Sequence, residues 1–183
     1  MRATPPGREA LVVVDVQCGL FDGPDGAVDA AGTLGRINTL IGKARAAGRP
    51  VIFIQHDEPP DLVPDTPAWA LHPSLDRRPT DPVIRKTTCD AFCRTSLDEE
   101  LRGRAVTTLF VAGYATEFCI DSTVRAAASR GYHVVVVGDA HTTQDRPPLP
   151  AAQIIALFHW VWPNLAADPP VAVRDARSVH FEG

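Results

Sequence analysis

The segment VTTLFVAGYATEFCIDSTVRAAASRG (residues 106–131) joins an apolar run to a helical pattern and places a cysteine at the junction. Residues 106–113 are mostly apolar or β-branched, which is typical of a strand buried on both faces. The part from about Cys119 to Arg130 has helical spacing and is followed by a glycine, a common helix stop. A buried strand that leads directly into a helix is the repeating unit of an α/β fold.

The rest of the chain repeats this alternation of apolar runs and helical patterns. Further strands are predicted at residues 10–16, 50–55, 82–86, 132–140 and 170–176. Further helices are predicted at residues 27–48, 96–103 and 150–161. Apolar strands joined by helical crossovers indicate a parallel sheet covered on both sides. The sequence therefore predicts one α/β domain over residues 1–183, a three-layer, doubly wound sheet of about six parallel strands with helices on both faces.

Charge and composition narrow the classes of partner. The formal net charge of -4 gives no electrostatic attraction to nucleic acid or to an anionic membrane. No stretch reaches the roughly 18 consecutive apolar residues of a membrane span, and the first ten residues lack the apolar run of a secretory signal. We therefore expect a cytoplasmic protein with reduced thiols that acts on a small molecule.

Three reactive side chains fall where predicted strands end. Asp15 closes the first strand, Lys86 closes the third, and the turn after the fourth leads to Cys119. In parallel sheets ligands bind beyond the carboxyl ends of the strands, so these groups are expected at one edge. A helix start and a lysine stabilise a thiolate, and a carboxylate can accept its proton. Each residue alone has an ordinary structural explanation, but together they predict a nucleophilic cysteine site.

Five ordered segments resemble the isochorismatase-like cysteine hydrolases, a superfamily that includes nicotinamidases and N-carbamoylsarcosine amidohydrolase. These segments read LVVVDVQCGLF, VIFIQHD, VIRKTTCDAFCRTSL, LFVAGYATEFCIDSTVRAAASRGYHVVVVGDA and IIALFHW. The resemblance implies a catalytic triad of Asp15, Lys86 and Cys119. It also implies a cis peptide between Tyr114 and Ala115. We expect the backbone N–H groups of Ala115 and Cys119 to form the oxyanion hole.

A small amide or carbamoyl compound is the substrate class that this constellation favours, cleaved at a C–N bond through a thioester on Cys119. Two other functions stay open. One is vinyl-ether hydrolysis of the isochorismatase type, with Asp15 as general acid and Cys119 as a bystander. The other is a non-catalytic binding domain. In isochorismatases the cysteine position holds a residue that cannot act as a thiol nucleophile, so the cysteine here argues against ether hydrolysis.

The second strand departs from the metal-binding pattern of the family. Nicotinamidases bind a metal through an Asp and two or more His residues after this strand. Here His56 stands where the metal-binding Asp is expected, and the next histidine, His72, lies 16 residues further on. We therefore predict no metal ion and no cofactor.

Polar and aromatic side chains near the predicted site are candidates for substrate contacts. They are Gln17, Phe21, His56, Trp69, Tyr114 and Phe118. Gln17 shares a side of the first strand with Asp15, so it could hold Asp15 or bind substrate. The aromatic residues favour a small, partly planar or apolar amide. We assign only structural or incidental roles to Cys18, Cys89 and Cys93.

The last helix predicts self-association into a homodimer or homotetramer. The stripe expected to cover the sheet comprises Ile154, Leu157, Phe158 and Val161. Trp160 and Trp162 fall partly off that stripe, and exposed aromatic side chains are enriched in interfaces. The alternative is that the long loop at residues 57–81 folds over these two rings.

Overall fold

The structure is a computed structural model that describes residues 8–23 and 26–182. Six described strands form one sheet in the order β3-β2-β1-β4-β5-β6, and every neighbouring pair is parallel. The strands are β1 Arg8–Val14, β2 Val51–His56, β3 Val83–Lys86, β4 Val106–Tyr114, β5 His133–Thr142 and β6 Ala172–Arg174. The chain starts at the centre of the sheet and winds outward in both directions. The predicted doubly wound parallel sheet is therefore confirmed.

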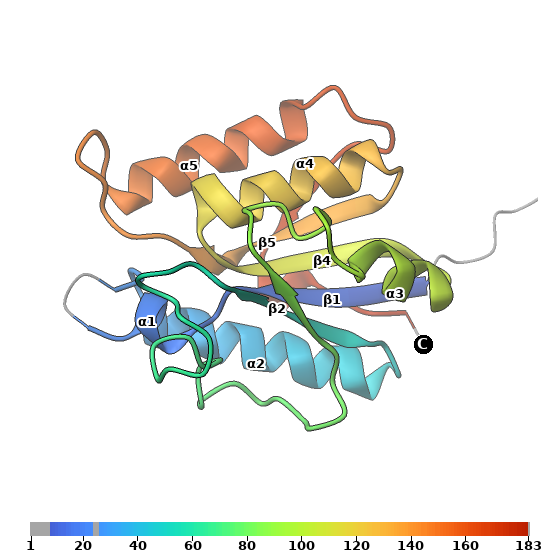
Figure 1. Cartoon of the computed structure of the whole chain (residues 1–183). Coiled ribbons are helices and arrows are strands. Elements are labelled where there is room, and N and C mark those ends of the chain that lie inside the picture. The colour runs from blue at the N-terminus through green and yellow to red at the C-terminus, as the bar shows by residue number, and fades with distance from the viewer. Residues whose placement is uncertain (1–7, 24–25, 183) are drawn as a thin grey trace, which may run out of the picture.

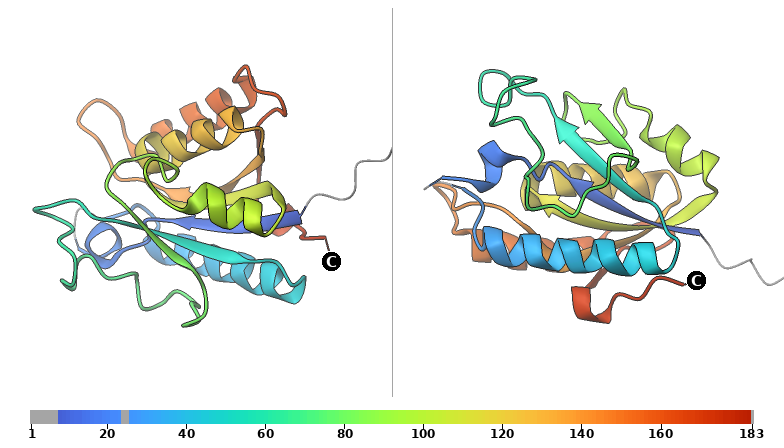
Figure 2. Two further views of the ribbon diagram at one scale, coloured as in Figure 1. Left: turned by 45° about the vertical axis from the view of Figure 1, so that its right-hand side comes forward. Right: turned by 90° about the horizontal axis from the view of Figure 1, so that it is seen from below.

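Helices cover both faces of this sheet (Figures 1 and 2). The α-helices are α1 Cys18–Phe21, α2 Ala30–Ala46, α3 Leu97–Gly103, α4 Asp121–Ser129 and α5 Ala151–Val161. Shorter turns are the π-helical η1 Thr116–Ile120 and the 3₁₀ turns η2 Trp162–Asn164 and η3 Ala176–Ser178. Helix α2 lies on one face, and α3, α4 and α5 lie on the other (Figure 1). No helix in the described ranges is long and apolar enough to cross a membrane.

Strand β1 shows why the apolar runs are unbroken. Successive side chains of a strand point to opposite faces, and here both faces are covered. Val12 and Val14 belong to the core beneath α3 and α4, whereas Leu11 and Val13 belong to the core beneath α2. All four side chains are at most 1% exposed. Because both faces of this central strand are covered, successive positions along it need apolar residues.

The structure corrects two expected helix starts and adds one short helix. The helix expected from residue 27 begins at Ala30, and the short helix α1 was not predicted. Cys119 does not start an α-helix, because it lies inside the π-helical turn η1 and α4 begins at Asp121. In this turn the N–H of Ile120 donates to the carbonyl oxygen of Ala115, five residues back. One such turn is too short to leave a period in the sequence.

The loop at residues 57–81 is anchored beside the carboxyl end of β1. The N–H of Cys18 donates to the carbonyl oxygen of Ala70, and the N–H of His72 donates to the carbonyl oxygen of Val16. These bonds hold the loop next to the strand ends. The loop therefore forms a wall of the strand-end region.

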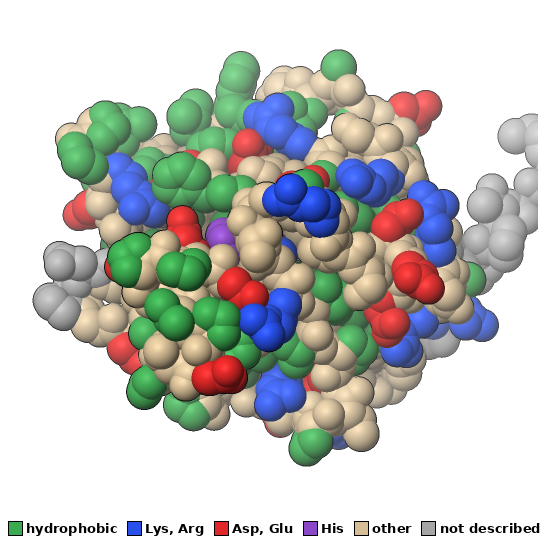
Figure 3. Space-filling model, viewed as in Figure 1, with side chains coloured by type: hydrophobic (Ala, Val, Ile, Leu, Met, Phe, Trp, Pro, Cys, Tyr) green, Lys and Arg blue, Asp and Glu red, His purple; other side chains and the backbone are tan. Residues whose placement is uncertain are grey.

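Helix α5 corrects the expected packing of its aromatic residues. Trp160 is 67% exposed, as the sequence suggested, but Trp162 is fully buried and its indole N–H donates to Asp121 Oδ1 at 3.0 Å. The cause is η2, a 3₁₀ turn that carries Trp162 inward against the core. Leu157, expected to cover the sheet, is 47% exposed. Apolar side chains gather over α5 on the face shown in Figure 3.

Candidate active site

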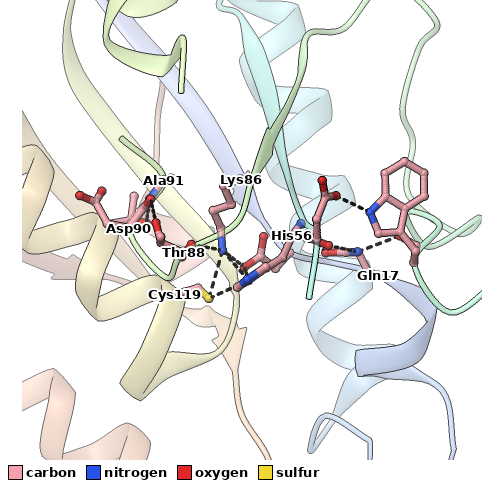
Figure 4. A network of polar contacts seen from close by, with 11 residues as sticks. Gln17, His56, Lys86, Thr88, Asp90, Ala91 and Cys119 are labelled. Carbon is pink, nitrogen blue, oxygen red and sulfur yellow. Dashed lines mark hydrogen bonds and ion pairs between the residues drawn. The ribbon is translucent and has the colours of Figure 1, made fainter. Parts of the chain in front are cut away.

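The carboxyl ends of four strands bring four functional side chains together. Asp15 follows β1, His56 ends β2, Lys86 ends β3, and Cys119 lies in the turn after β4. Strands β1 and β4 are neighbours that continue in opposite directions across the sheet, so this is its topological switch point. His56 and Lys86 are paired in register on adjacent strands. Figure 4 shows the side chains of His56, Lys86 and Cys119 converging.

The ammonium group of Lys86 is the centre of this cluster. Its Nζ lies 2.7 Å from Asp15 Oδ2, 2.8 Å from His56 Nδ1, 3.0 Å from the carbonyl oxygen of Thr88 and 3.2 Å from Cys119 Sγ. Both partners of the Asp15–Lys86 ion pair are sealed from solvent, with at most 1% of either side chain exposed. An ammonium has three protons and here meets four acceptors. Lys86 therefore cannot donate to all four at once.

Charges and burial decide where the protons reside. Burial lowers the pKa of Lys86, but the charge of Asp15 and the hydrogen bonds to Asp15 and Cys119 outweigh it and hold the pKa above its ordinary value. Burial raises the pKa of the Cys119 thiol far above its ordinary value, the charge of Asp15 raises it further, and Lys86 only partly opposes them. The resting site therefore holds an Asp15–Lys86 ion pair beside a protonated thiol. This corrects the expectation that the helix start would stabilise a thiolate.

Backbone geometry places Asp15 close to the turn that follows β4. Gly113 has φ +124°, and a Cβ added there would lie 2.0 Å from the carbonyl oxygen of Val14. Only glycine lets β4 approach β1 this closely. Asp15 itself has φ 50°, a left-handed conformation that Asp tolerates better than most residues. Its Oδ1 is buried without a hydrogen-bond partner among the described residues, and so can accept a proton.

The peptide between Tyr114 and Ala115 is cis. It directly precedes η1, which carries Cys119. Ala115 is 2% exposed, and its carbonyl oxygen accepts the N–H groups of Phe118 and Ile120. The turn that presents the thiol is thus held by its own backbone.

Gln17 positions His56. Its Nε2 donates to the carbonyl oxygens of His56 (3.0 Å) and Trp69 (2.8 Å), and its Oε1 accepts the N–H of His56 (2.8 Å). The side chain is fully buried. Its amide group is engaged on both sides, so Gln17 fixes the end of β2.

The aromatic candidates lie in three different settings. Tyr114 is buried, with its ring centroid 6.0 Å from that of Phe21, and its hydroxyl donates to Gln144 Oε1 at 2.9 Å. Phe118 adjoins Cys119 and is 48% exposed. The indole of Trp69 is held elsewhere, because its N–H donates to Asp57 Oδ1 at 2.7 Å.

A second polar chain lies against the cysteine turn and was missed from the sequence. His141 Nδ1 lies 2.9 Å from Thr116 Oγ1, and His141 Nε2 lies 3.0 Å from His159 Nε2. Burial, together with the charge that His159 can carry, lowers the pKa of His141 to about 3. Burial also lowers the pKa of His159, so both rings are neutral near pH 7. The signal that could have found this chain is the pair of polar residues that ends strand β5, His141 and Thr142.

The side chains that could hold a metal ion are the same ones that surround Lys86. The donor atoms of Asp15, His56 and Cys119 lie within 4.8 Å of one another. The ammonium of Lys86 lies 2.7 to 3.2 Å from all three, so it occupies the place that a metal ion would need. A second cation does not fit there while Lys86 is charged.

The remaining cysteines carry free thiols. Cys18, Cys89 and Cys93 are partly buried, and only Cys119 is fully buried among the four. Cys89 packs against the core that includes Cys119. Burial and the nearby charge of Asp22 raise the pKa of the Cys18 thiol.

Comparison with known proteins finds hydrolases among the relatives of the chain. A family model described as Isochorismatase domain matches residues 9–159. Streptothricin hydrolase of Streptomyces noursei is 41% identical over 78% of this chain and 57% of its own length, so the chain spans little more than half of that relative. Ureidoacrylate amidohydrolase RutB of Methylobacterium radiotolerans is 33% identical over 87% of this chain and 78% of its own length. The crystal structure of an isochorismatase family protein is similar, with TM-score 0.83 and 35% identity over 90% of this chain and 96% of that one.

Proposed function

The chain belongs to the isochorismatase family, and we propose that it hydrolyses a C–N bond of a small amide or carbamoyl compound through a thioester on Cys119. The observation that carries the proposal is the sealed cluster in which Lys86 Nζ lies 2.7 Å from Asp15 Oδ2 and 3.2 Å from Cys119 Sγ. The likeness to ureidoacrylate amidohydrolase supports amide hydrolysis as the class of reaction.

The reaction begins from the protonated thiol. When substrate reaches the site, the proton of Cys119 passes to Asp15, whose Oδ1 has no other hydrogen-bond partner among the described residues. The sulfur then attacks the carbonyl carbon, a C–S bond forms, and the C=O electron pair moves to oxygen. Lys86 Nζ already lies within hydrogen-bond distance of Sγ and stabilises the negative sulfur as it forms. The backbone N–H groups of Ala115 and Cys119 hold the oxyanion.

Collapse of this intermediate breaks the C–N bond. Asp15 returns the proton to the departing nitrogen, and ammonia or an amine leaves a thioester on Cys119. Water then attacks the thioester carbonyl with Asp15 as the base that accepts its proton. The acid product departs, and the sulfur regains its proton from Asp15. Lys86 stays charged throughout, because its pKa is raised and the negative charge passes from the carboxylate to the sulfur, to the oxyanion and back within the same site.

The walls of the site favour a small, partly planar or apolar substrate. Phe118 offers an exposed ring next to the thiol, and Tyr114 and Phe21 pack together close by. The guanidinium of Arg146 lies 5.1 Å from the centroid of the Phe118 ring, and its Nε donates to Glu117 Oε1 at 2.7 Å. Because Glu117 balances this charge, we do not expect a dicarboxylate substrate.

Ammonia release from a panel of primary amides and carbamoyl compounds tests the proposal. We expect turnover by the wild-type protein and none above background by Cys119→Ala or Cys119→Ser. Full activity of Cys119→Ser on a vinyl ether would instead support ether hydrolysis with Asp15 as general acid. Binding of one of these compounds together with no turnover of any of them would support a binding domain.

A further inference from the structure

The tautomer of His56 follows from its contact with Lys86. Nδ1 of the imidazole lies 2.8 Å from Lys86 Nζ. A proton on Nδ1 would point at an ammonium group 2.8 Å away, which has no lone pair to accept it. Nδ1 therefore faces Lys86 with its lone pair, and the ring proton resides on Nε2. The other groups that face Nδ1 are Asp15 Oδ2 and Cys119 Sγ, both at 3.7 Å. His56 is therefore a neutral ring whose acceptor nitrogen is turned toward the charged cluster.

The orientation of this ring is fixed by its surroundings. Gln17 bonds both the N–H and the carbonyl oxygen of His56, and the residue ends a strand paired in register with β3. Only 6% of His56 is exposed. The ring cannot turn Nε2 toward Lys86 without losing the 2.8 Å contact. The Nε2–H bond of His56 consequently points in one fixed direction, away from Lys86.

The Nε2–H group is a donor without an acceptor in the protein. Nε2 makes no hydrogen bond to any residue in the described ranges, yet it is not among their sealed, unpartnered side-chain atoms. It therefore keeps access to solvent while the rest of the ring is enclosed. Nδ1 of the same ring lies 3.7 Å from Cys119 Sγ, so the ring that carries this donor is a direct neighbour of the atom that would attack a substrate.

We propose that His56 is a specificity-determining residue, whose Nε2–H donates a hydrogen bond to an acceptor atom that the substrate carries beside its scissile amide. This inference rests on the proposed amide hydrolysis. The acceptor can be a ring nitrogen or a second carbonyl oxygen. A substrate without such an acceptor would displace water from Nε2 and leave the Nε2–H donor buried and unpaired. Because an unpaired buried donor costs free energy, the site should discriminate against that substrate.

Benzamide and the three pyridinecarboxamides test this preference, because they share one shape and differ only by a ring nitrogen. The three isomers present the acceptor at three distances from the amide. We expect at least one isomer to be hydrolysed with kcat/KM about tenfold above benzamide, the size of one hydrogen bond. Equal values for all four compounds would overturn the proposal.

Two substitutions of His56 distinguish the role of Nδ1 from the role of Nε2. In His56→Asn, the amide oxygen can take the place of Nδ1 toward Lys86, but nothing reaches the position of Nε2. In His56→Gln, the amide nitrogen reaches the position of Nε2, but Lys86 loses its acceptor. We expect His56→Asn to lose the tenfold preference, and His56→Gln to keep it while turning over both compounds more slowly. Equal loss on both compounds in both variants would mean that His56 acts only through Lys86.

A matched control is His133→Asn, since His133 is exposed at the opposite, amino-terminal end of β5. It should keep the wild-type ratio of pyridinecarboxamide to benzamide. A ratio that changes as much as in His56→Asn would show that the effect is not local to the site.

A readout independent of catalysis is the ¹⁵N spectrum of the imidazole, assigned by comparison with His56→Asn. We expect a protonated Nε2 and an unprotonated Nδ1 near pH 7, and a proton on Nδ1 would overturn the inference. If no amide is cleaved at all, the proposed function fails by itself. Binding of the four compounds to Cys119→Ser protein then decides the role of His56: a preference lost in Cys119→Ser/His56→Asn supports it, and equal binding contradicts it.

Discussion

His56 and His141 are both buried, with exposed fractions of 6% and 3%, and both contact the turn that carries Cys119. Their neighbours differ. His56 faces the ammonium of Lys86 and the carboxylate of Asp15, whereas His141 faces a threonine hydroxyl and a second imidazole. His56 therefore belongs to a charged cluster in which we propose that Cys119 and Asp15 exchange a proton. His141 belongs to a chain that is neutral near pH 7.

The difference shows that burial alone does not give a histidine its role. Beside an ion pair, the ring of His56 has a fixed tautomer and a free donor. Behind the turn, both nitrogens of His141 are already engaged, and its lowered pKa keeps the ring uncharged. We therefore assign the chemistry to the charged cluster and the positioning of the turn to the neutral chain.

The largest expected effect comes from removing a charge of the cluster. Asp15→Asn and Lys86→Met should each lower kcat/KM by about 10³-fold or more, because we propose that both belong to a catalytic triad, and the members of a triad act as one unit. The double variant should be little worse than either single one. Steady-state ammonia release measures these losses on protein whose folding has been checked, since breaking a buried ion pair also destabilises the fold by about 3–5 kcal/mol.

His141→Gln is the matched change in the neutral chain. We expect its kcat/KM to stay within about tenfold of wild type, in line with a positioning role rather than a chemical one. A loss as large as that of Asp15→Asn would erase the distinction between the two regions.

The neutral chain should instead make stability depend on pH. The pKa of His141 is about 3 when folded and 6.5 in the reference state. Between these values the unfolded chain binds more protons, so the free energy of unfolding falls as the pH falls, by up to about 1.4 kcal/mol per pH unit. Urea unfolding at pH 6.5 and pH 5 should show about 2 kcal/mol of this loss in wild type. The same loss in His141→Gln would exclude His141 as its source.

Thr116 should show a smaller effect on the same chain. Thr116→Val removes the hydroxyl and leaves a buried nitrogen of His141 unpaired, which should cost about 1–3 kcal/mol of stability. Thr116→Ser keeps the hydroxyl and should recover most of that loss. Urea unfolding of the two variants compares them directly. Equal stabilities would mean that the bond to His141 contributes nothing to the turn.

The smallest expected effect lies on α5, away from both regions. Trp160 is 67% exposed and Leu157 is 47% exposed on this helix, which suits the expected homodimer or homotetramer. Trp160→Ala should weaken that assembly. Light scattering measures it: a wild-type mass near the 19.7 kDa of one chain at micromolar concentration would contradict assembly. The buried Trp162 belongs to the core and does not serve this test.

The sheet could be predicted because burial on both faces forces apolar residues along entire strands, as in β1 and β4. The strand-end positions of Asp15 and Lys86 followed from the same pattern. The π-helical turn at Cys119 could not, since five residues leave no period. The inward turn of Trp162 and the pairing of His141 with His159 depend on contacts between separate elements, which the order of residues does not reveal.

The protonation of Cys119 was also beyond the sequence, for a physical reason. A helix start and a lysine argue for a thiolate, but the burial of the thiol and the charge of Asp15 outweigh them. Only the three-dimensional positions show which effect is larger. The sequence thus predicted which groups lie together at the strand ends, and the structure adds how burial and charge shift the pKa of Lys86 and Cys119.

The most direct measurement is mass spectrometry of protein quenched in acid during turnover of a good amide substrate. We expect the mass of the acyl group on the peptide that contains Cys119, released by hydroxylamine as a thioester and absent from Cys119→Ala. Lys86→Met should accumulate little of it, and His141→Gln should accumulate it normally. Turnover with no adduct on Cys119, an adduct only on Cys18, Cys89 or Cys93, or an active Cys119→Ala protein would contradict covalent catalysis at this cluster.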